Sequence, residues 1–86
     1  MKLSDDERER AMDELVESIT TMSKDKTGAL ITFERRQSLQ DFINTGVKVS
    51  ASIKAELLTT IFYEGTPLHD GATIIKNDMI VASACF

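Results

Sequence analysis

The last fifteen residues of the chain constrain its fold more than any other segment. Two runs rich in apolar residues, 72–76 and 79–86, are separated only by Asn77 and Asp78. Both of these residues tolerate the positive φ angles of a tight turn, so the segment predicts a β-hairpin. The second run is apolar at consecutive positions, which predicts an interior strand buried on both faces. The sequence offers no later element to pair with this strand, so we expect it to leave an open, apolar sheet edge.

The first predicted element is a long amphipathic helix. Ser4 followed by Glu7 matches a capping box, which places the start of the helix at Ser4. Apolar side chains then recur every three or four residues, so one face of the helix is expected to pack against the rest of the protein. That face consists of Met12, Leu15, Val16, Ile19 and Met22.

Short helices and strands are expected to alternate between the long helix and the hairpin. They are a strand at 29–33, a helical turn at 38–43, an extended segment at 47–49, a helix with apolar side chains between 53 and 61, and a loop at 63–70. The strand at 29–33 is apolar except for Thr32, which predicts cover on both faces. Ser50 or Ser52 is expected to cap the helix that follows it. The order of elements predicts an α/β fold class, with a mixed twisted sheet flanked by helices.

The composition limits the function classes that this chain can belong to. Its 86 residues make one domain at most, and 42% apolar with 28% charged residues is typical of a soluble globular protein. A net charge of -4 argues against general binding to nucleic acid or anionic membranes, because both need clustered Lys and Arg. We therefore expect no nucleic-acid partner and no membrane contact within this chain. A bound nucleotide would need local groups or a metal ion.

The single cysteine and the absence of a long apolar run bear on the compartment. Cys85 cannot form an internal disulfide, and its place in an apolar run predicts a buried thiol in a reducing compartment. A nucleophilic role for Cys85 lacks a nearby base, since His69 is the only histidine. No run approaches the ~20 apolar residues of a spanning helix. The chain is expected to be cytoplasmic, either by itself or as a soluble domain of a membrane-anchored parent.

The segment from Thr66 to Ala72 carries the residues best suited to chemistry. Pro67 fixes one backbone angle, and Asp70 stands beside Gly71 where a loop enters the predicted strand. Glycine lets a ligand approach the backbone closely, and loop-strand junctions of α/β sheets collect ligand groups. An ordinary structural turn accounts for the same pattern, because Asp-Gly commonly begins or ends a strand.

Four blocks of the sequence, taken together, resemble the diadenylate cyclase (DAC) domain. In order, they are 27–35, 39–46, 56–62 and 66–72, and the similarity runs from about Met12 to Phe86. The resemblance implies a helical extension at 1–11, followed at 12–86 by the N-terminal part of an incomplete DAC-type fold. Enzymes of this family join two ATP molecules into cyclic di-AMP and release pyrophosphate.

The resemblance also implies roles for particular residues. Asp70 would bind Mg²⁺ or Mn²⁺ and activate a ribose hydroxyl, while Gly71 and Ala72 would line the nucleotide site. Phe86 falls beside the position where the family recognises adenine, and packing on the base or filling the core are both open to it. His69 has two possible roles: a ligand of Mn²⁺ or phosphate, or a structural hydrogen bond.

The sequence departs from the family pattern after Phe86. The family continues into a Leu-Pro-Leu segment, an Arg-His-Arg motif that holds phosphates and an acidic residue, none of which is present in these 86 residues. We therefore expect the isolated chain to be catalytically incomplete. The implied partners are ATP and a second copy of the domain facing the first. The alternative is a non-catalytic α/β module that acts in oligomerisation or regulation. The glycines form neither a P-loop nor a dinucleotide fingerprint.

Overall fold

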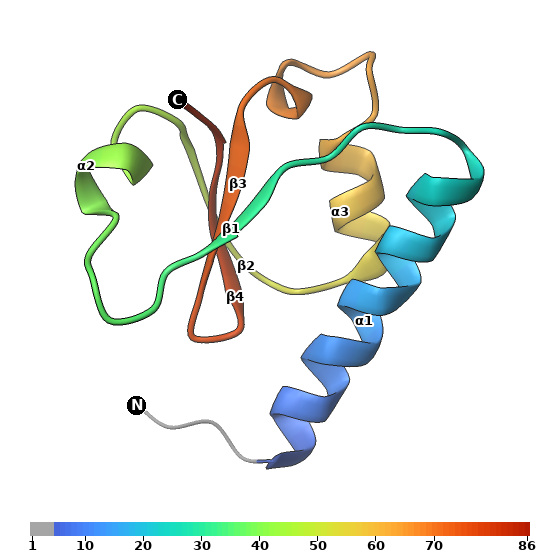
Figure 1. Cartoon of the computed structure of the whole chain (residues 1–86), viewed down its shortest axis with the longest axis horizontal. Helices are drawn as coiled ribbons and strands as arrows, with labels where there is room; N and C mark the ends of the chain where they lie inside the picture. Colours follow the sequence, from blue (N-terminus) through green and yellow to red (C-terminus); the bar gives the residue numbers. More distant parts are fainter. Residues whose placement is uncertain (1–4) are drawn as a thin grey trace.

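A single mixed sheet of four strands, in the order β1-β3-β4-β2, organises the structure. The structure is a computed structural model that describes residues 5–86. Its elements are α1 (Asp5–Lys24), β1 (Ile31–Phe33), α2 (Gln40–Ile43), β2 (Val47–Ser52), α3 (Ala55–Ile61), the 3-10 turn η1 (Pro67–His69), β3 (Ala72–Lys76) and β4 (Met79–Cys85). Figure 1 shows α1 and α3 on one side of the sheet and α2 on the other. The predicted α/β fold class is confirmed.

The predicted hairpin is present, and its turn is the one expected. Asn77 and Asp78 both have positive φ, 52° and 57°, as a two-residue hairpin turn requires. The strands pair antiparallel from Lys76 opposite Met79 to Ala72 opposite Cys85. The Cys85 side chain is buried as predicted.

The expected open edge on β4 is wrong. β4 pairs with β3 on one side and with β2 on the other, both antiparallel, so it is an interior strand of the sheet. The prediction failed because β2 is six residues long, whereas only Val47 to Val49 were expected to be extended. β2, which precedes β4 in the sequence, therefore pairs with the edge of β4 that was expected to stay open. The edges of the sheet within residues 5–86 are β1 and β2.

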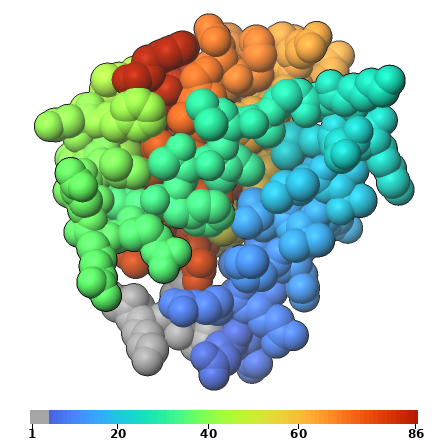
Figure 2. Space-filling model, viewed as in Figure 1, coloured from blue at the N-terminus to red at the C-terminus, as the bar shows by residue number. Residues whose placement is uncertain are grey.

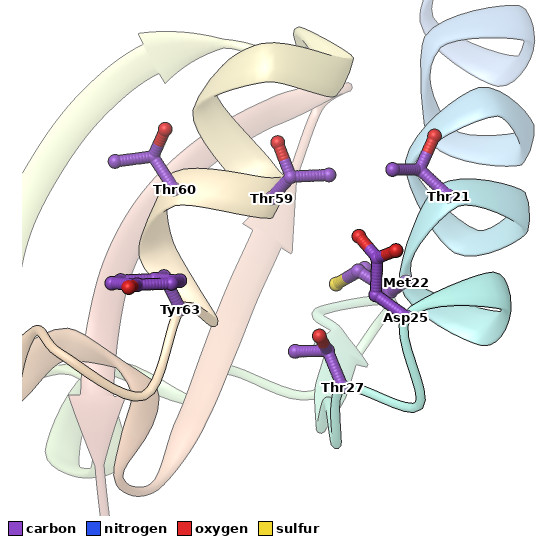
Figure 3. Close-up of a pocket in the computed structure, with 7 residues that line it drawn as sticks. All are labelled: Thr21, Met22, Asp25, Thr27, Thr59, Thr60 and Tyr63. Carbon is purple, nitrogen blue, oxygen red and sulfur yellow. The ribbon is translucent and has the colours of Figure 1, made fainter.

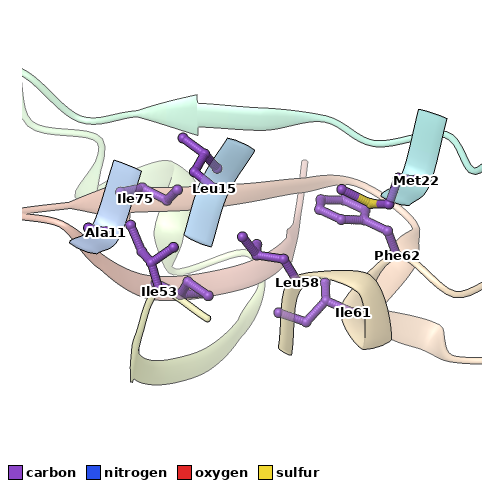
Figure 4. Packing of buried hydrophobic residues seen from close by; sticks show 9 residues of the cluster. Ala11, Leu15, Met22, Ile53, Leu58, Ile61, Phe62 and Ile75 are labelled. Carbon is purple, nitrogen blue, oxygen red and sulfur yellow. The ribbon is translucent and has the colours of Figure 1, made fainter. Parts of the chain in front are cut away.

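The sheet has a different hydrophobic cluster on each face. The larger cluster joins the sheet to α1 and α3, and Figure 4 shows its side chains. Its buried members are Ala11, Leu15, Met22, Ile53, Leu58, Ile61, Phe62, Ile75 and Ile80. The smaller cluster lies under α2 and consists of Ile43, Ala72, Ile74, Ala82 and Cys85. Alternate residues of β3 thus serve opposite layers, as the period of a strand requires.

The packed face of α1 differs from the predicted one. The buried residues are Ala11, Leu15, Ser18 and Met22. Leu15 and Met22 are buried as predicted, whereas Met12, Val16 and Ile19, which were also expected to pack, are each at least half exposed. Both sets have the same spacing of three and four residues, so periodicity alone cannot choose between them. The small side chains of Ala11 and Ser18 let the helix approach closely, and the Ser18 hydroxyl is satisfied by donating to the Leu15 carbonyl at 2.7 Å.

The start of α3 is held by α1 and not by a serine cap. The Ala55 N–H donates to the Glu14 carboxylate at 2.7 Å, and Arg10 donates to the Ile53 carbonyl at 2.9 Å. A carboxylate at a helix N-terminus satisfies a free donor and favours the helix dipole. Ser50 instead lies in a bulge of β2 with a φ of 50°. The predicted capping box at Ser4 lies outside the described residues.

The first strand is shorter and more exposed than predicted. β1 comprises only Ile31 to Phe33, and Ala29 and Leu30 precede it on the surface. Phe33 is also exposed, so the expectation of a strand covered on both faces is wrong. β1 pairs with β3 in parallel, with Thr32 opposite Ile74, and occupies an edge of the sheet. Within residues 5–86, no helix has the length and apolar character needed to cross a membrane.

Candidate functional site

The loop that carries Asp70 is tied to the end of α3. The Thr66 hydroxyl donates to the carbonyls of Ile61 and Tyr63, each at 3.1 Å. Pro67 then begins the single turn of η1, for which its fixed backbone angle is suited. Asp70 follows in an extended conformation with its side chain exposed. The loop therefore presents one carboxylate to solvent at the point where β3 begins.

Gly71 is required by its conformation and by its surroundings. Its φ is 99°, in the region that favours glycine. A Cβ at this position would lie 2.7 Å from the Cys85 carbonyl oxygen and 2.9 Å from the Ala84 carbonyl carbon. The backbone after Asp70 is therefore packed directly against the end of β4.

Phe86 leaves the sheet at the same end as Asp70. Ala72 pairs antiparallel with Cys85, so the residues before the first and after the second extend from one end of the hairpin. The Thr45 hydroxyl accepts from the Phe86 N–H at 2.9 Å. Its own proton is shared between the Phe42 carbonyl at 2.6 Å and the Phe86 carbonyl at 3.2 Å. Phe86 is 67% exposed, and both of its possible roles stay predictions. The fold thus brings Asp70, Gly71, Ala72 and Phe86 to one region.

A bulge in β4 shapes this end of the hairpin, and the sequence analysis missed it. Ala84 has a φ of 57°, which is uncommon for a residue other than glycine. The register between β3 and β4 shifts between Ala72 and Ile74, close to this residue. Such bulges redirect a strand end and are frequent beside functional sites. Alanine has no preference for this conformation, so no local signal in the sequence could have revealed it.

His69 already uses one ring nitrogen for structure. Its Nδ1 donates a hydrogen bond to the main-chain oxygen of Thr66, because a carbonyl oxygen can only accept. This contact closes the η1 turn and agrees with the structural alternative. The remaining Nε2 atom is then an acceptor in the neutral ring.

The residues around Asp70 suit a cation shared with a substrate better than a metal cage. Among residues 5–86 there is no group of three or more His, Cys, Asp or Glu side chains placed to hold a metal ion. Mg²⁺ commonly binds through one or two carboxylates, with phosphate oxygens and water completing its shell. A single exposed carboxylate beside a glycine fits that mode.

A hollow elsewhere in the molecule is a weaker candidate. It has a volume of about 370 Å³ and lies between the ends of α1 and α3. Figure 3 shows its lining residues, which are Thr59, Thr60 and Tyr63 on the α3 side and Thr21, Met22, Asp25 and Thr27 on the α1 side. The Thr59 and Thr60 hydroxyls donate to carbonyls of their own helix at 3.0 and 2.8 Å. The hydroxyl protons of Thr59 and Thr60 are therefore already used in hydrogen bonds within α3 and are not available to a ligand in the hollow.

Buried and paired ionisable groups lie close to the sheet. Burial raises the pKa of the Cys85 thiol, which keeps it protonated and unreactive. The Glu34 carboxylate accepts from the Leu39 N–H at 2.6 Å and lies 3.0 Å from the Lys76 ammonium. The Leu39 hydrogen bond first, and Lys76 second, lower the pKa of Glu34. These groups stabilise the fold and take no part in the Asp70 site.

Comparison with known proteins gives consistent matches over most of the chain. The chain is 42% identical to the cyclic di-AMP synthase CdaA of Bacillus subtilis over 79 residues, which is 92% of this chain and 29% of that protein. It is 40% identical to the diadenylate cyclase of Mycoplasma genitalium over 81 residues, 93% of this chain and 40% of the relative. The chain thus spans well under half the length of these curated relatives.

A solved structure and a family profile give the same assignment. The crystal structure of a double mutant of DacA from Staphylococcus aureus matches with a TM-score of 0.91 and 40% identity, over 96% of this chain and 55% of that chain. The family described as "DisA bacterial checkpoint controller nucleotide-binding", or DAC, matches residues 16–86. Since this match takes in most of the sequence, the chain belongs to the DAC family.

Proposed function

We propose that these 86 residues form part of a diadenylate cyclase, which condenses two ATP molecules into cyclic di-AMP and releases pyrophosphate. The observation that carries the proposal is the meeting of Asp70, Gly71 and Phe86 at one end of the β3–β4 hairpin. The relatives named diadenylate cyclase or cyclic di-AMP synthase support it.

Asp70 is the proposed catalytic residue. Each ribose 3′-hydroxyl must attack the α-phosphate of the other ATP, and a hydroxyl is a weak nucleophile until its proton is made more acidic. Mg²⁺ or Mn²⁺, when bound at Asp70, would supply that acidification and neutralise phosphate charge. Asp70 suits this role because it is exposed and makes no ion pair with another described residue.

The neighbours of Asp70 would hold the nucleotide. Gly71 has no side chain to keep the nucleotide from the backbone. The Ala72 side chain is buried under α2, so a contact from Ala72 to the nucleotide would come from its backbone. The ring of Phe86, which belongs to an exposed residue, would pack on the adenine base. The free Nε2 atom of His69 is available to a metal ion or, when protonated, to a phosphate.

The reaction needs a second copy of the site. Two ATP molecules attack each other, so each of two facing domains would present one ATP with its own Asp70 and metal ion. The exposed location of Asp70 and Phe86 is compatible with such an approach. The proposed partners are therefore ATP and a second copy of the domain.

The test replaces a charge without changing the size of the side chain. The matched region of the S. aureus DacA domain is exchanged for residues 1–86 of this chain, giving a protein that we call the DacA chimera. Asp70→Asn in the chimera should lower cyclic di-AMP synthesis from radiolabelled ATP by more than about 100-fold. The amide would no longer hold the metal ion that makes the hydroxyl more acidic, and this loss costs several kcal/mol of transition-state stabilisation. ATP binding, measured by calorimetry, should weaken much less, since most nucleotide contacts lie elsewhere.

Asp25→Asn is the matched control. Asp25 is also exposed, but it lines the hollow between α1 and α3. Activity of the Asp25 variant should equal that of the unaltered chimera. Activity of the Asp70 variant within about threefold of the unaltered chimera, roughly 0.7 kcal/mol, would remove Asp70 from the mechanism. A folded chimera that binds ATP without forming product would favour the non-catalytic alternative.

A further inference from the structure

The sheet leaves the main chain of Phe86 without a partner strand. β3 pairs with β4 as far as Cys85, and β2 pairs with β4 only as far as Ser83. Phe86 follows both of these residues, so neither ladder reaches it. Within residues 5–86, the hydrogen bonds of its N–H and its carbonyl both go to the Thr45 hydroxyl. One side chain therefore holds the residue that is proposed to pack on adenine.

Thr45 is itself fixed at the end of α2. The Thr45 N–H donates to the Phe42 carbonyl at 3.1 Å, and the Gly46 N–H donates to the Ile43 carbonyl at 3.1 Å. The Thr45 hydroxyl shares its proton between the carbonyls of Phe42 and Phe86, so it joins the last turn of α2 to the end of β4. The position of this hydroxyl is therefore set by the main chain around α2.

Gly46 brings this support into direct contact with β4. A Cβ at Gly46 would lie 2.3 Å from the Ser83 carbonyl oxygen and 2.5 Å from the Cys85 sulfur. Real side chains do not approach so closely, so glycine is what allows the segment after α2 to lie against the strand. Ile43 is buried in the same small cluster as Cys85. Thr45 therefore lies between two residues that pack on the end of β4.

The segment around α2, the end of β4 and the loop with Asp70 share one region of the surface. Figure 2 shows the C-terminal end of the chain, in dark red, between the yellow-green segment around α2 and the orange loop that leads to β3. Thr45, Phe86 and Asp70 are all exposed. Phe86 thus lies between the residue that holds it and the carboxylate proposed to bind the metal ion.

The hydrogen bonds to Thr45 fix the direction of a side chain. They hold the main chain on both sides of the Phe86 Cα atom, and the direction of the Cα–Cβ bond follows from the planes of the adjoining peptide groups. The ring then keeps only its own side-chain rotations. A ring that is held in this way is ready to pack on a base before the base arrives, which lowers the entropy cost of binding.

We propose that Thr45 is a positioning residue of the nucleotide site, whose hydroxyl holds the main chain of Phe86 so that the ring can pack on the adenine base. The inference rests on the proposed function, because it takes Phe86 as the contact with adenine. Thr45 has no assigned role at the phosphates or at the reacting hydroxyl. Its loss should therefore weaken the binding of ATP and leave the chemistry at Asp70 in place.

Binding of an ATP analogue that cannot react provides the test. α,β-Methylene-ATP lacks the bridging oxygen that leaves with pyrophosphate, so calorimetry can measure its affinity for the DacA chimera without turnover. Phe86→Ala should weaken binding at least about 10-fold, because the stack of the base on an aromatic ring is lost. Thr45→Val should weaken binding about 5-fold, and Thr45→Ser should stay within about twofold of the unaltered chimera.

A double variant separates positioning from a general loss of structure. If Thr45 acts through the ring, Thr45→Val should add less than about twofold to the loss that Phe86→Ala already causes. Ile53→Val is the control for stability, because it removes a buried methyl group from the larger cluster on the other face of the sheet. Its unfolding midpoint should fall by an amount similar to that of Thr45→Val, while its affinity for the analogue stays unchanged.

Three results would overturn the proposal. They are unchanged affinity in a folded Thr45→Val chimera, an equal loss from Thr45→Val with and without the Phe86 ring, and no loss from Phe86→Ala. A chimera that shows the expected order of affinities but forms no cyclic di-AMP from ATP would count against the proposed catalysis and would still support the role of Thr45.

A fluorescent reporter tests the same point in the 86-residue chain if the chimera does not fold. The chain contains no tryptophan, so Phe86→Trp introduces a single emitter. Adding Thr45→Val should at least about double the amplitude of the fast component of the time-resolved anisotropy, because the ring gains motion on the nanosecond timescale. Equal amplitudes with and without the Thr45 hydroxyl would overturn the proposal.

Discussion

The two ends of the β3–β4 hairpin differ in how their charged groups are used. At the turn end, Lys76 lies 3.0 Å from the Glu34 carboxylate. Asp78 lies 3.5 Å from Arg8, an ion pair too long to be a hydrogen bond. At the site end, the Asp70 carboxylate takes part in no ion pair with another described residue. The turn end uses its charges to hold the structure, whereas the site end leaves its charge available to a ligand.

The site end is positioned by backbone contacts instead. Gly71 lies against the main chain of Ala84 and Cys85, and the Thr45 hydroxyl makes two hydrogen bonds to the main chain of Phe86. Such contacts fix geometry without neutralising the carboxylate. We therefore expect substitutions at the site end to lower stability by disturbing the backbone. At the turn end, we expect stability to depend on pH.

The largest expected effect on stability is that of Gly71→Ala. The added Cβ would lie 2.7 Å from the Cys85 oxygen, and alanine disfavours a φ of 99°. Strain and overpacking together should lower the free energy of unfolding by about 2–4 kcal/mol. Urea denaturation of the 86-residue chain measures this loss.

Gly28→Ala is the control for that change. A Cβ at Gly28 would meet no atom within 4 Å, and its φ is not in the region that favours glycine. Alanine should therefore be neutral or raise stability by about 0.5 kcal/mol, by restricting the unfolded chain. Similar losses for the two variants would show that close packing at Gly71 does not fix the site end.

Loss of the Thr45 hydroxyl should have the next largest effect. Thr45→Val removes the hydrogen bond from the Phe86 N–H and the hydroxyl donation shared by the Phe42 and Phe86 carbonyls. The loss should cost about 1–2 kcal/mol in the same denaturation experiment. Thr45→Ser keeps the hydroxyl and should recover most of the loss. Thr60→Val is a matched control, because that exposed hydroxyl donates only to its own helix. A loss from Thr60→Val as large as that from Thr45→Val would contradict the special role of Thr45.

These two ends also show what could be predicted from the sequence. The turn end was predictable, because Asn77 and Asp78 carry a local conformational preference that matches a hairpin turn. The resemblance to the DAC family also predicted that Asp70, Gly71, Ala72 and Phe86 belong to one site. The helix and strand order was predictable from the same kind of local pattern.

What the sequence did not reveal depends on contacts between distant segments. β2 covers β4 through pairs of residues that lie 27 to 36 positions apart, such as Ser52 with Met79 and Val47 with Ser83. The apolar pattern of β4 alone does not indicate which segment pairs with it. Packing against α3 buries the face of α1 that contains Leu15 and Met22. The neighbouring face with Val16 has the same periodicity but is exposed. The hydrogen bond between the Phe86 N–H and the Thr45 hydroxyl likewise joins residues 41 positions apart. Tertiary pairing, and not propensity, decided each of these features.

At the turn end, a pH-dependent effect is expected from Glu34. The Leu39 N–H and, after it, Lys76 lower the pKa of Glu34 below 4.5, so folding favours the ionised carboxylate. The stability contributed by this group is therefore present above the unfolded pKa and is lost as pH falls through the lower folded pKa. Glu34→Gln should flatten the dependence of the urea midpoint on pH below about 4.5.

Lys76→Met separates the two causes of this shift. The Leu39 hydrogen bond is the largest single cause, whereas Lys76 lowers the pKa of Glu34 both by a hydrogen bond and by its charge. Removing Lys76 should therefore leave the part of the pH dependence that the Leu39 hydrogen bond produces. Full loss of the pH dependence in the Lys76 variant would make the ion pair dominant. An unchanged pH profile for Glu34→Gln would show that Glu34 does not stabilise the turn end in this way.

The smallest expected effect returns to the site end, at the bulge in β4. Ala84 has a φ of 57°, where a Cβ costs roughly 1–2 kcal/mol, and glycine removes that cost. Glycine also gives the unfolded chain more freedom, which offsets roughly 0.5–1 kcal/mol of the gain. Ala84→Gly should therefore raise the free energy of unfolding by about 0.5 kcal/mol. Ala82→Gly in the same strand should lower it by about 1 kcal/mol, because Ala82 is fully buried and its φ is not positive. If both variants lose stability equally, the bulge at Ala84 stores no strain, and the site end is shaped by Gly71 and Thr45 alone.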